Sequence, residues 1–175
     1  GEAVYEREHP PGFRWLHESF GTNWRMTEMQ AVIGRIQLRR MGVWHAERLN
    51  NLNMLWQAAR QLPGLRVPVL PEKIEHAAYK GYVFVVPEQL QLGWNRDRIM
   101  QEINQRGVPC YSGSCSEIYL EKAFADTGWR PQERLPIAQE LGETSLMFLV
   151  HPGLTAREIE LTTQVLGAVM RLASR

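Results

Sequence analysis

The chain has 175 residues, which is enough for one domain with a substantial core and short for two full domains. Apolar residues make up 44% of it and charged residues 22%, as in ordinary globular proteins, so the composition excludes a wholly disordered chain. The net charge of +1 gives no electrostatic reason to expect nucleic acid or an anionic membrane as a partner.

No apolar run approaches the roughly 18 residues of a membrane span, and the first residues lack the basic-then-apolar pattern of a signal peptide. The two cysteines, Cys110 and Cys115, lie too close together in a Ser/Gly-rich stretch to indicate a disulfide framework. The sequence therefore predicts a cytoplasmic protein with no membrane and no nucleic-acid partner.

Residues 1–26 show no helical or strand period and contain two adjacent prolines, so they predict an irregular arm or connector. The first regular element is predicted to begin at Thr27, which matches a capping box together with Gln30. Apolar residues at helical spacing then continue to about residue 62, with one interruption at Gly42. This pattern predicts two long helices, or one long helix bent near Gly42.

The rest of the chain alternates strand-like and helix-like segments. We predict a Pro-rich connector over residues 67–71, a strand over 79–86, a helix capped by Asn95 over 95–107 and a short strand over 108–111. A loop over residues 112–116 follows, and then two helical segments over 118–124 and 135–141. A second strand over 145–150 and a final capped helix over 155–175 complete the chain. With the long N-terminal helices, this order predicts an α+β fold in which a small sheet carries helices on one face.

The sequence contains no motif for a self-sufficient active site. Its five histidines are scattered without the spacing of a zinc site, and glycine-rich phosphate loops and the GxSxG motif are absent. A nucleophilic cysteine would need a histidine base, so Cys110 and Cys115 are interpreted as ordinary small residues. Lys73, Lys80 and Lys122 are interpreted as surface residues, because a cofactor-bearing lysine must be desolvated or charge-coupled. We predict no catalytic residue and no metal ligand.

Residues 19–28 have features typical of a segment that binds an anion. Asn23 and Arg25 lie just before the first capped helix, where free amides and the positive end of the helix dipole favour a phosphate or carboxylate. Arg25 offers a forked pair of donors suited to such anions. An equally good interpretation is that Asn23 occupies a turn with positive φ and that Arg25 pairs with Glu28 or is solvated.

Residues 21–38, GTNWRMTEMQAVIGRIQL, resemble the G-x-N-x-R-M-[T/S]-E-x-Q-A-A-x-G-x-x-Q-L signature of the DegT/StrS-type sugar aminotransferases, which depend on pyridoxal 5'-phosphate (PLP). Three later features agree in order: Arg48 on the following helix, the GVPCY step at residues 107–111 and the HPGLT step at residues 151–155. The resemblance runs from about Phe20 to the C-terminus.

The resemblance implies the architecture of the fold-type-I PLP aminotransferases. Residues 27–175 would be the C-terminal small domain with its long connecting helices, and residues 1–26 would be the connector from a missing large domain. That N-terminal domain would hold the Schiff-base lysine and the Asp that pairs with the pyridinium nitrogen. Asn23 would reach across a homodimer to the cofactor phosphate of the other subunit, and Arg25 would contact cofactor or substrate nearby.

Tyr111 and the loop after it match the region of this family that approaches the nucleotide sugar, which implies substrate contact for Tyr111. The usual family pattern there is an aromatic residue, one or two prolines and a histidine, whereas this loop contains neither proline nor histidine. The hydroxyls of Ser112, Ser114 and Ser116 would instead bind sugar or phosphate. His151, at a strand-to-helix junction, is interpreted as structural.

The implied parent reaction transfers an amino group, with glutamate as the expected donor, to a keto group on a nucleotide-linked sugar in polysaccharide or related sugar biosynthesis. The chain alone is predicted to be inactive and not to retain PLP. One alternative is a stand-alone, non-catalytic α+β module for ligand binding or dimerisation, and another is a fold-type-I PLP enzyme acting on amino acids. An exposed apolar surface beside residues 21–28 would favour the aminotransferase, and a closed polar surface the stand-alone module.

Overall fold

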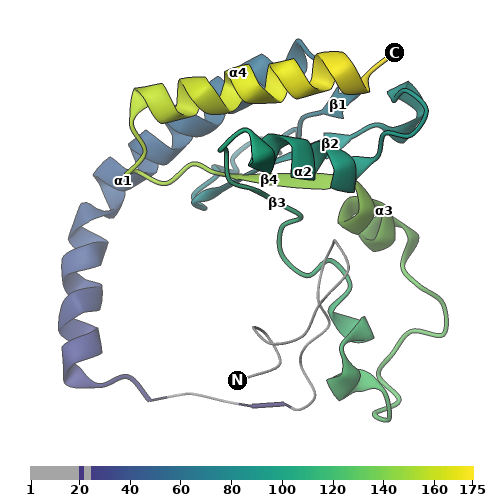
Figure 1. Cartoon of the computed structure of the whole chain (residues 1–175). Coiled ribbons are helices and arrows are strands. Elements are labelled where there is room, and N and C mark those ends of the chain that lie inside the picture. The colour runs from purple at the N-terminus through teal and green to yellow at the C-terminus, as the bar shows by residue number, and fades with distance from the viewer. Residues whose placement is uncertain (1–19, 22–24) are drawn as a thin grey trace.

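The computed structural model describes residues 20–21 and 25–175. Helices and strands follow along the described chain (Figure 1) as α1 (Glu28–Arg60), β1 (Leu65–Arg66), β2 (Lys80–Val85), α2 (Arg96–Gln105), β3 (Cys110–Tyr111), α3 (Pro136–Thr144), β4 (Ser145–Leu149) and α4 (Ala156–Ala173). Short 3-10 turns lie at Pro87–Gln89, Ile118–Leu120 and Lys122–Phe124. The protein is an α+β fold with a small sheet, as the sequence predicts.

The strands form one antiparallel sheet in the order β1-β2-β4-β3. Side chains alternate between the two faces of a strand. Gly81, Val83 and Val85 of β2 point to the face that α1 and α4 cover, which we call the helix face. Lys80, Tyr82 and Phe84 point to the opposite face, which we call the loop face. Tyr82 of β2, Met147 of β4 and Tyr111 of β3 lie opposite one another in one row of the loop face.

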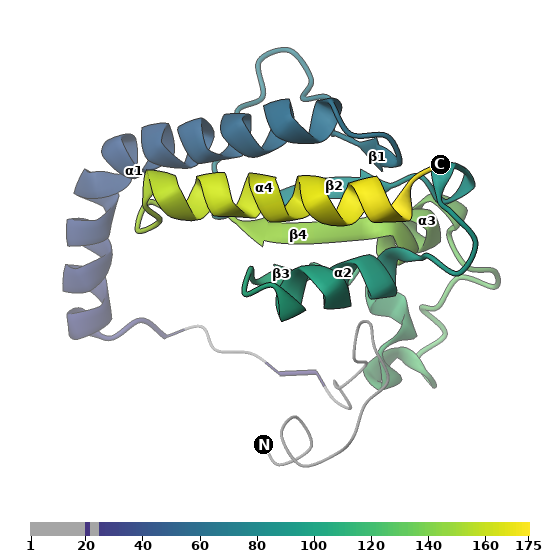
Figure 2. The same ribbon diagram turned by 45° about the horizontal axis from the view of Figure 1, so that its top comes forward.

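The helix face carries the core. The second half of α1 lies beside α4, and α2 lies on the other side of α4 (Figures 1 and 2). The fully buried side chains come from the three helices and from the strands: Leu52, Leu55, Val83, Ile99, Ile103, Leu146, Phe148, Leu166, Val169 and Met170. A Cβ at Gly81 would lie 2.9 Å from Leu52 Cδ1 and 3.1 Å from Leu55 Cδ2. The glycine therefore allows α1 to approach β2 closely.

Capping residues set where the helices begin, as predicted. Thr27 with Gln30, and Thr155 with Glu158, form capping boxes in which side chain and backbone bond reciprocally. Asn95 caps α2 by accepting a hydrogen bond from a first-turn amide. These three starts are confirmed to within one residue.

The long N-terminal segment is one helix of 33 residues. Its axis turns part-way along (Figures 1 and 2), which agrees with the second of the two predicted alternatives. Nothing lies within 4 Å of a Cβ placed at Gly42. The glycine therefore occupies an open position, where it costs about 1 kcal/mol relative to alanine without ending the helix.

The structure departs from the sequence-based expectations in three places. The short helix expected at residues 118–124 consists of two 3-10 turns. The edge strand β1 precedes the Pro-rich connector and was not predicted, because two residues are too few to show a period. The helices do not all lie on one face: α3 lies at the loop face, where its Glu140 pairs with Arg66 at 3.5 Å, and Arg66 in turn lies 4.6 Å from the centroid of the Phe84 ring.

Replacing Gly81 by valine should destabilise the fold by about 1–3 kcal/mol, because the added atoms would press on Leu52 and Leu55 in a closely packed core. Gly42→Ala is the matched control and should stabilise the fold by about 0.5–1 kcal/mol, since that position is open and helical. Urea denaturation of both variants measures these differences. A Gly81→Val protein as stable as the wild type would contradict the close approach of α1 to β2.

Candidate functional site

The predicted anion-binding segment lies at the start of α1. Asn23 is outside the described residues, so its role stays a prediction. Arg25 is exposed and forms no ion pair with Glu28. The capping box of Thr27 and Gln30 occupies two backbone amides and leaves those of the first two helical residues without intrahelical partners. The Arg25 guanidinium and these amides are therefore accessible at the same end of the helix.

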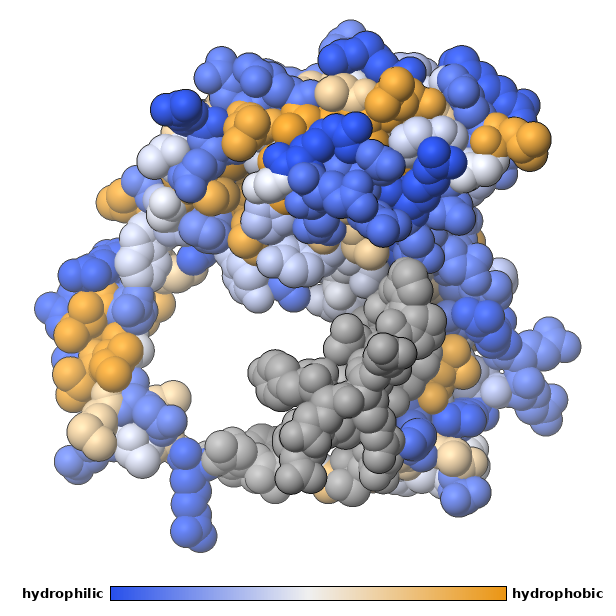
Figure 3. All heavy atoms as spheres, in the orientation of Figure 1, coloured by the Kyte–Doolittle hydropathy of each residue, from blue (hydrophilic) through white to orange (hydrophobic). Residues whose placement is uncertain are grey.

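The first half of α1 extends away from the body and carries apolar side chains in solvent. Figure 3 shows apolar atoms gathered on this part of the helix. The exposed large apolar residues of this region are Met26, Met29, Val32, Ile33, Ile36, Leu38 and Val43. Apolar residues at helical spacing were predicted along this part of the chain, and we call these exposed residues the α1 stripe. The spacing is confirmed, but the stripe packs against nothing among the described residues, and it lies beside Arg25.

The predicted substrate loop, residues 112–116, lies against Tyr82 on the loop face. The Tyr82 hydroxyl accepts a hydrogen bond from the Ser114 amide at 3.1 Å and donates one to Ser114 Oγ at 3.4 Å. Gly113 has φ +97°, and a Cβ there would lie 2.5 Å from Tyr82 Cε1. Only glycine therefore lets the loop lie flat on the tyrosine ring.

The three predicted serines do not converge on one point. Ser114 is exposed and turned toward Tyr82, whereas Ser116 packs against Gly142 of α3. The Ser112 carbonyl accepts a hydrogen bond from Ser145 Oγ at 2.6 Å, which ties the loop to β4. Tyr111 remains 47% exposed. Of the predicted contacts, Tyr111 and Ser114 are thus the ones open to a ligand.

Two residues that the sequence did not single out fix the far end of this loop. Glu117 is buried, and Arg134 binds both its carboxylate oxygens, with Nε donating at 2.9 Å. The Tyr119 hydroxyl donates to the same carboxylate at 2.6 Å. The hydrogen bonds from Arg134, aided by that from Tyr119, lower the pKa of Glu117 against the opposing effect of burial. The partners are 17 positions apart, so no local pattern could reveal the pair.

The other groups considered from the sequence offer no nucleophile. Cys110 is buried, and burial raises the pKa of its thiol to about 12, so it stays protonated at neutral pH. Burial also raises the pKa of Cys115. Lys73 and Lys122 are exposed, and Lys80 donates to Ser114 Oγ at 3.1 Å. The ring of His151 accepts a hydrogen bond from the Gly153 amide, in keeping with a structural role.

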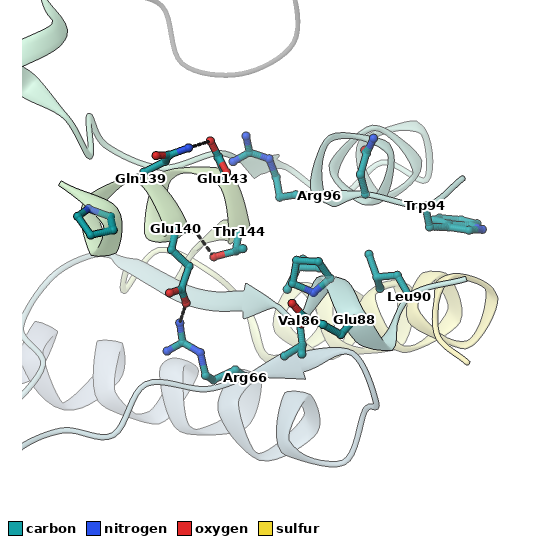
Figure 4. Close-up of a pocket in the computed structure, with 14 residues that line it drawn as sticks. Arg66, Val86, Glu88, Leu90, Trp94, Arg96, Gln139, Glu140, Glu143 and Thr144 are labelled. Carbon is teal, nitrogen blue, oxygen red and sulfur yellow. Dashed lines mark hydrogen bonds and ion pairs between the residues drawn. The ribbon is translucent and has the colours of Figure 1, made fainter. Parts of the chain in front are cut away.

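A separate cleft of about 550 Å³ opens between β2, α2 and α3 (Figure 4). Its polar side chains mostly bind one another or the backbone: Arg66 pairs with Glu140, Gln139 donates to Glu143, and Arg96 donates to two backbone carbonyls. None of the predicted site residues lines it.

In the described part of the chain, no three His, Cys, Asp or Glu side chains gather as metal ligands. No helix there has the length and apolar character needed to cross a membrane.

Residues 6–168 match the DegT/DnrJ/EryC1/StrS aminotransferase family. The chain belongs to this family. The solved aminotransferase of Psychrobacter cryohalolentis is 56% identical to it, with a TM-score of 0.79 over 97% of this chain and 45% of that one. The erythromycin biosynthesis sensory transduction protein EryC1 of Saccharopolyspora erythraea is 28% identical over 81% of this chain and 36% of its own length. The dTDP-3-amino-3,4,6-trideoxy-alpha-D-glucose transaminase of Streptomyces venezuelae is 26% identical over 93% and 40%.

Members of the DegT/DnrJ/EryC1/StrS family are PLP-dependent aminotransferases. One structural neighbour, a GDP-4-keto-6-deoxymannose-3-dehydratase, was solved with PLP and glutamate and shares the fold at a TM-score of 0.66. The chain spans less than half the length of each of these relatives.

The Glu117–Arg134 pair should make stability depend on acid pH. The pKa of Glu117 is lowered in the fold, so its contribution is present above the unfolded value of about 4.3 and is lost as pH falls through the folded value. Thermal melts between pH 6 and 3 should show a smaller acid-induced loss of Tm in Glu117→Gln, together with a Tm several degrees lower at pH 6. Glu133→Gln, at an exposed carboxylate next to Arg134, should keep the wild-type profile. Identical profiles for Glu117→Gln and wild type would contradict the pairing.

Proposed function

We propose that this chain is the C-terminal small domain of a PLP-dependent aminotransferase that converts a keto group on a nucleotide-linked sugar to an amine. Glutamate is the proposed donor, and the pathway is polysaccharide or related sugar biosynthesis. The observation that carries the proposal is the exposed apolar stripe of α1 beside Arg25. Free cysteines at positions 110 and 115 fit a reducing cytoplasm.

The stripe favours a larger enzyme over a stand-alone module. Contiguous exposed apolar surface is rare on self-contained proteins and marks surfaces that other protein covers. Here that surface lies on the half of α1 that leaves the core, largely within residues 21–38, which match the family signature. We infer that a preceding N-terminal domain and the second subunit of a homodimer cover it. The family members that the chain matches are more than twice its length, which leaves ample chain for such a domain.

The lysines support the same assignment. A lysine that holds PLP must have a pKa lowered by desolvation or by a neighbouring charge. Lys73 and Lys122 are exposed, and Lys80 is bound to a loop serine at the sheet. We therefore assign the reactive lysine, and the Asp beside the pyridinium nitrogen, to the preceding domain, and we propose that this chain alone does not retain PLP.

The residues of this chain would bind the cofactor and the nucleotide sugar and hold them in position. When bound, PLP supplies the stabilisation of the substrate carbanion. Asn23 and Arg25, with the free amides at the start of α1, would hold the cofactor phosphate of the partner subunit's site, because donors and a positive helix end suit a phosphate. Tyr111 and the loop carrying Ser112, Ser114 and Ser116 would approach the nucleotide sugar.

The isolated chain, supplied with PLP and glutamate, should show neither a stoichiometric Schiff-base absorbance band nor turnover. The full-length enzyme should show both, and Arg25→Ala in it should weaken PLP retention because one charge-assisted anion contact is lost. Absorbance titration with PLP and an assay of sugar amination measure these outcomes. A stoichiometric Schiff-base absorbance band together with turnover in the isolated chain would contradict the proposal.

The α1 stripe should behave as an interface. In the full-length enzyme, Ile33→Glu should lower Tm and promote dissociation of the dimer, because it places a charge on a surface that protein covers. Gln37→Glu, which adds the same charge at another exposed position of α1, is the matched control. Calorimetry and analytical ultracentrifugation provide the readouts. Equal behaviour of the two variants would indicate that the stripe stays in solvent.

A further inference from the structure

Lys80 is held at the substrate loop. It begins β2, is half-buried and lies on the loop face, where its Nζ donates a hydrogen bond to Ser114 Oγ at 3.1 Å. The same Nζ lies 5.4 Å from the centroid of the Tyr79 ring. Among the described residues no carboxylate pairs with it. A positive charge is therefore fixed at a loop that contains no basic residue of its own.

The side chains of Lys80 and Ser114 have only donors left to offer. Ser114 Oγ accepts hydrogen bonds from Lys80 Nζ and from the Tyr82 hydroxyl. A hydroxyl has two acceptor positions and one proton, so the Ser114 proton alone remains available. The Lys80 ammonium carries three protons and uses one of them here. A ligand at this pair thus meets the Lys80 ammonium and one hydroxyl donor, that of Ser114, whose two acceptor positions are already filled.

These donors are fixed before any ligand arrives. The Ser114 amide is bound by the Tyr82 hydroxyl, and Gly113 lies flat on the Tyr82 ring. Ser145 ties the preceding carbonyl of the loop to β4. A preformed set of donors loses little conformational freedom on binding, which favours affinity.

We propose that Lys80 Nζ and the Ser114 hydroxyl bind the diphosphate of the nucleotide-linked sugar; this inference rests on the proposed function. Sugar hydroxyls and base edges present donors as well as acceptors, whereas a diphosphate presents acceptors and negative charge only. It is the part of the substrate that matches a cationic cluster of donors. Tyr111 lies on the same face, two strands from β2 and in the row of Tyr82, two residues along from Lys80. The usual strand and residue spacings put it about 12 Å from Lys80, so an extended ligand reaches both.

The test uses the full-length enzyme with Lys80→Met, which removes the charge but keeps the length, and Lys80→Arg, which keeps the charge. Lys73→Met, at an exposed lysine of the connector, is the control. Calorimetric titration with dTDP, UDP, GDP and inorganic pyrophosphate at low and high salt gives the affinities, and steady-state assays give kcat and KM. Lys80→Met should weaken diphosphate binding about 10- to 100-fold and raise KM for the nucleotide sugar, with kcat retained. Lys80→Arg should recover most of the affinity.

The salt dependence of pyrophosphate affinity distinguishes direct binding by Lys80 from a purely structural role of Lys80. Loss of a direct ionic contact should make pyrophosphate affinity less sensitive to salt in Lys80→Met than in wild type, because screening acts on one charge fewer. Weaker binding with unchanged salt sensitivity and no rescue by Lys80→Arg would mean that Lys80 only holds the loop, and would overturn the proposal. So would unaltered binding in Lys80→Met.

The proposed function and the diphosphate site can fail separately. A wild type that binds dTDP through Lys80 but aminates no nucleotide sugar would remove the proposed reaction and leave the anion site. A wild type that aminates a nucleotide sugar, with Lys80→Met equal to it in KM, would leave the reaction and remove the site. A wild type that does neither would overturn both.

Discussion

The close packing of α1 on β2 positions both parts of the candidate site. Leu52 and Leu55 sit over Gly81, and the Trp56 indole donates to the Tyr82 carbonyl at 2.9 Å, so one half of α1 is locked to the sheet. A helix is a stiff, continuous hydrogen-bonded element. Fixing its second half therefore also sets where the first half lies, away from the body (Figure 1). The apolar stripe is held in a place where none of the described residues covers it.

The alternation of β2 links that core to the predicted substrate loop. Gly81 and Val83 lie on the helix face, against the helices. The alternating residues Lys80 and Tyr82 lie on the loop face and hold the loop of residues 112–116 there. A shift of one residue in the pairing with β4 would exchange these two sets. The burial of the core thus fixes the register that presents Lys80 and Tyr82 to Ser114.

The features that could be predicted from the sequence are those that depend on a few neighbouring residues. The capping boxes at Thr27 and Thr155, and the apolar runs that became β2 and β4, are local patterns of this kind. The edge strand β1, the placement of α3 and the Glu117–Arg134 pair depend on contacts between distant segments, which no window of sequence contains. Lys80 was interpreted as a surface lysine for the same reason: its partner, Ser114, lies 34 positions away. Asn23 lies outside the described residues and stays a prediction.

The two predicted binding regions have the same chemical character, and this bears on how the reaction would be divided. Arg25 at the start of α1 and Lys80 at the loop are cations without a carboxylate partner among the described residues. The buried thiol of Cys110, with a pKa of about 12, is no nucleophile at neutral pH. The described residues thus offer means to hold anions, and burial raises the pKa of both cysteine thiols. In the proposed enzyme, a substrate and a cofactor that both carry phosphate would be held by this domain at their charged ends, and bond making and breaking would fall to the domain that supplies the lysine. In the proposed enzyme, anions held at the edge of this domain would react only in contact with the second domain.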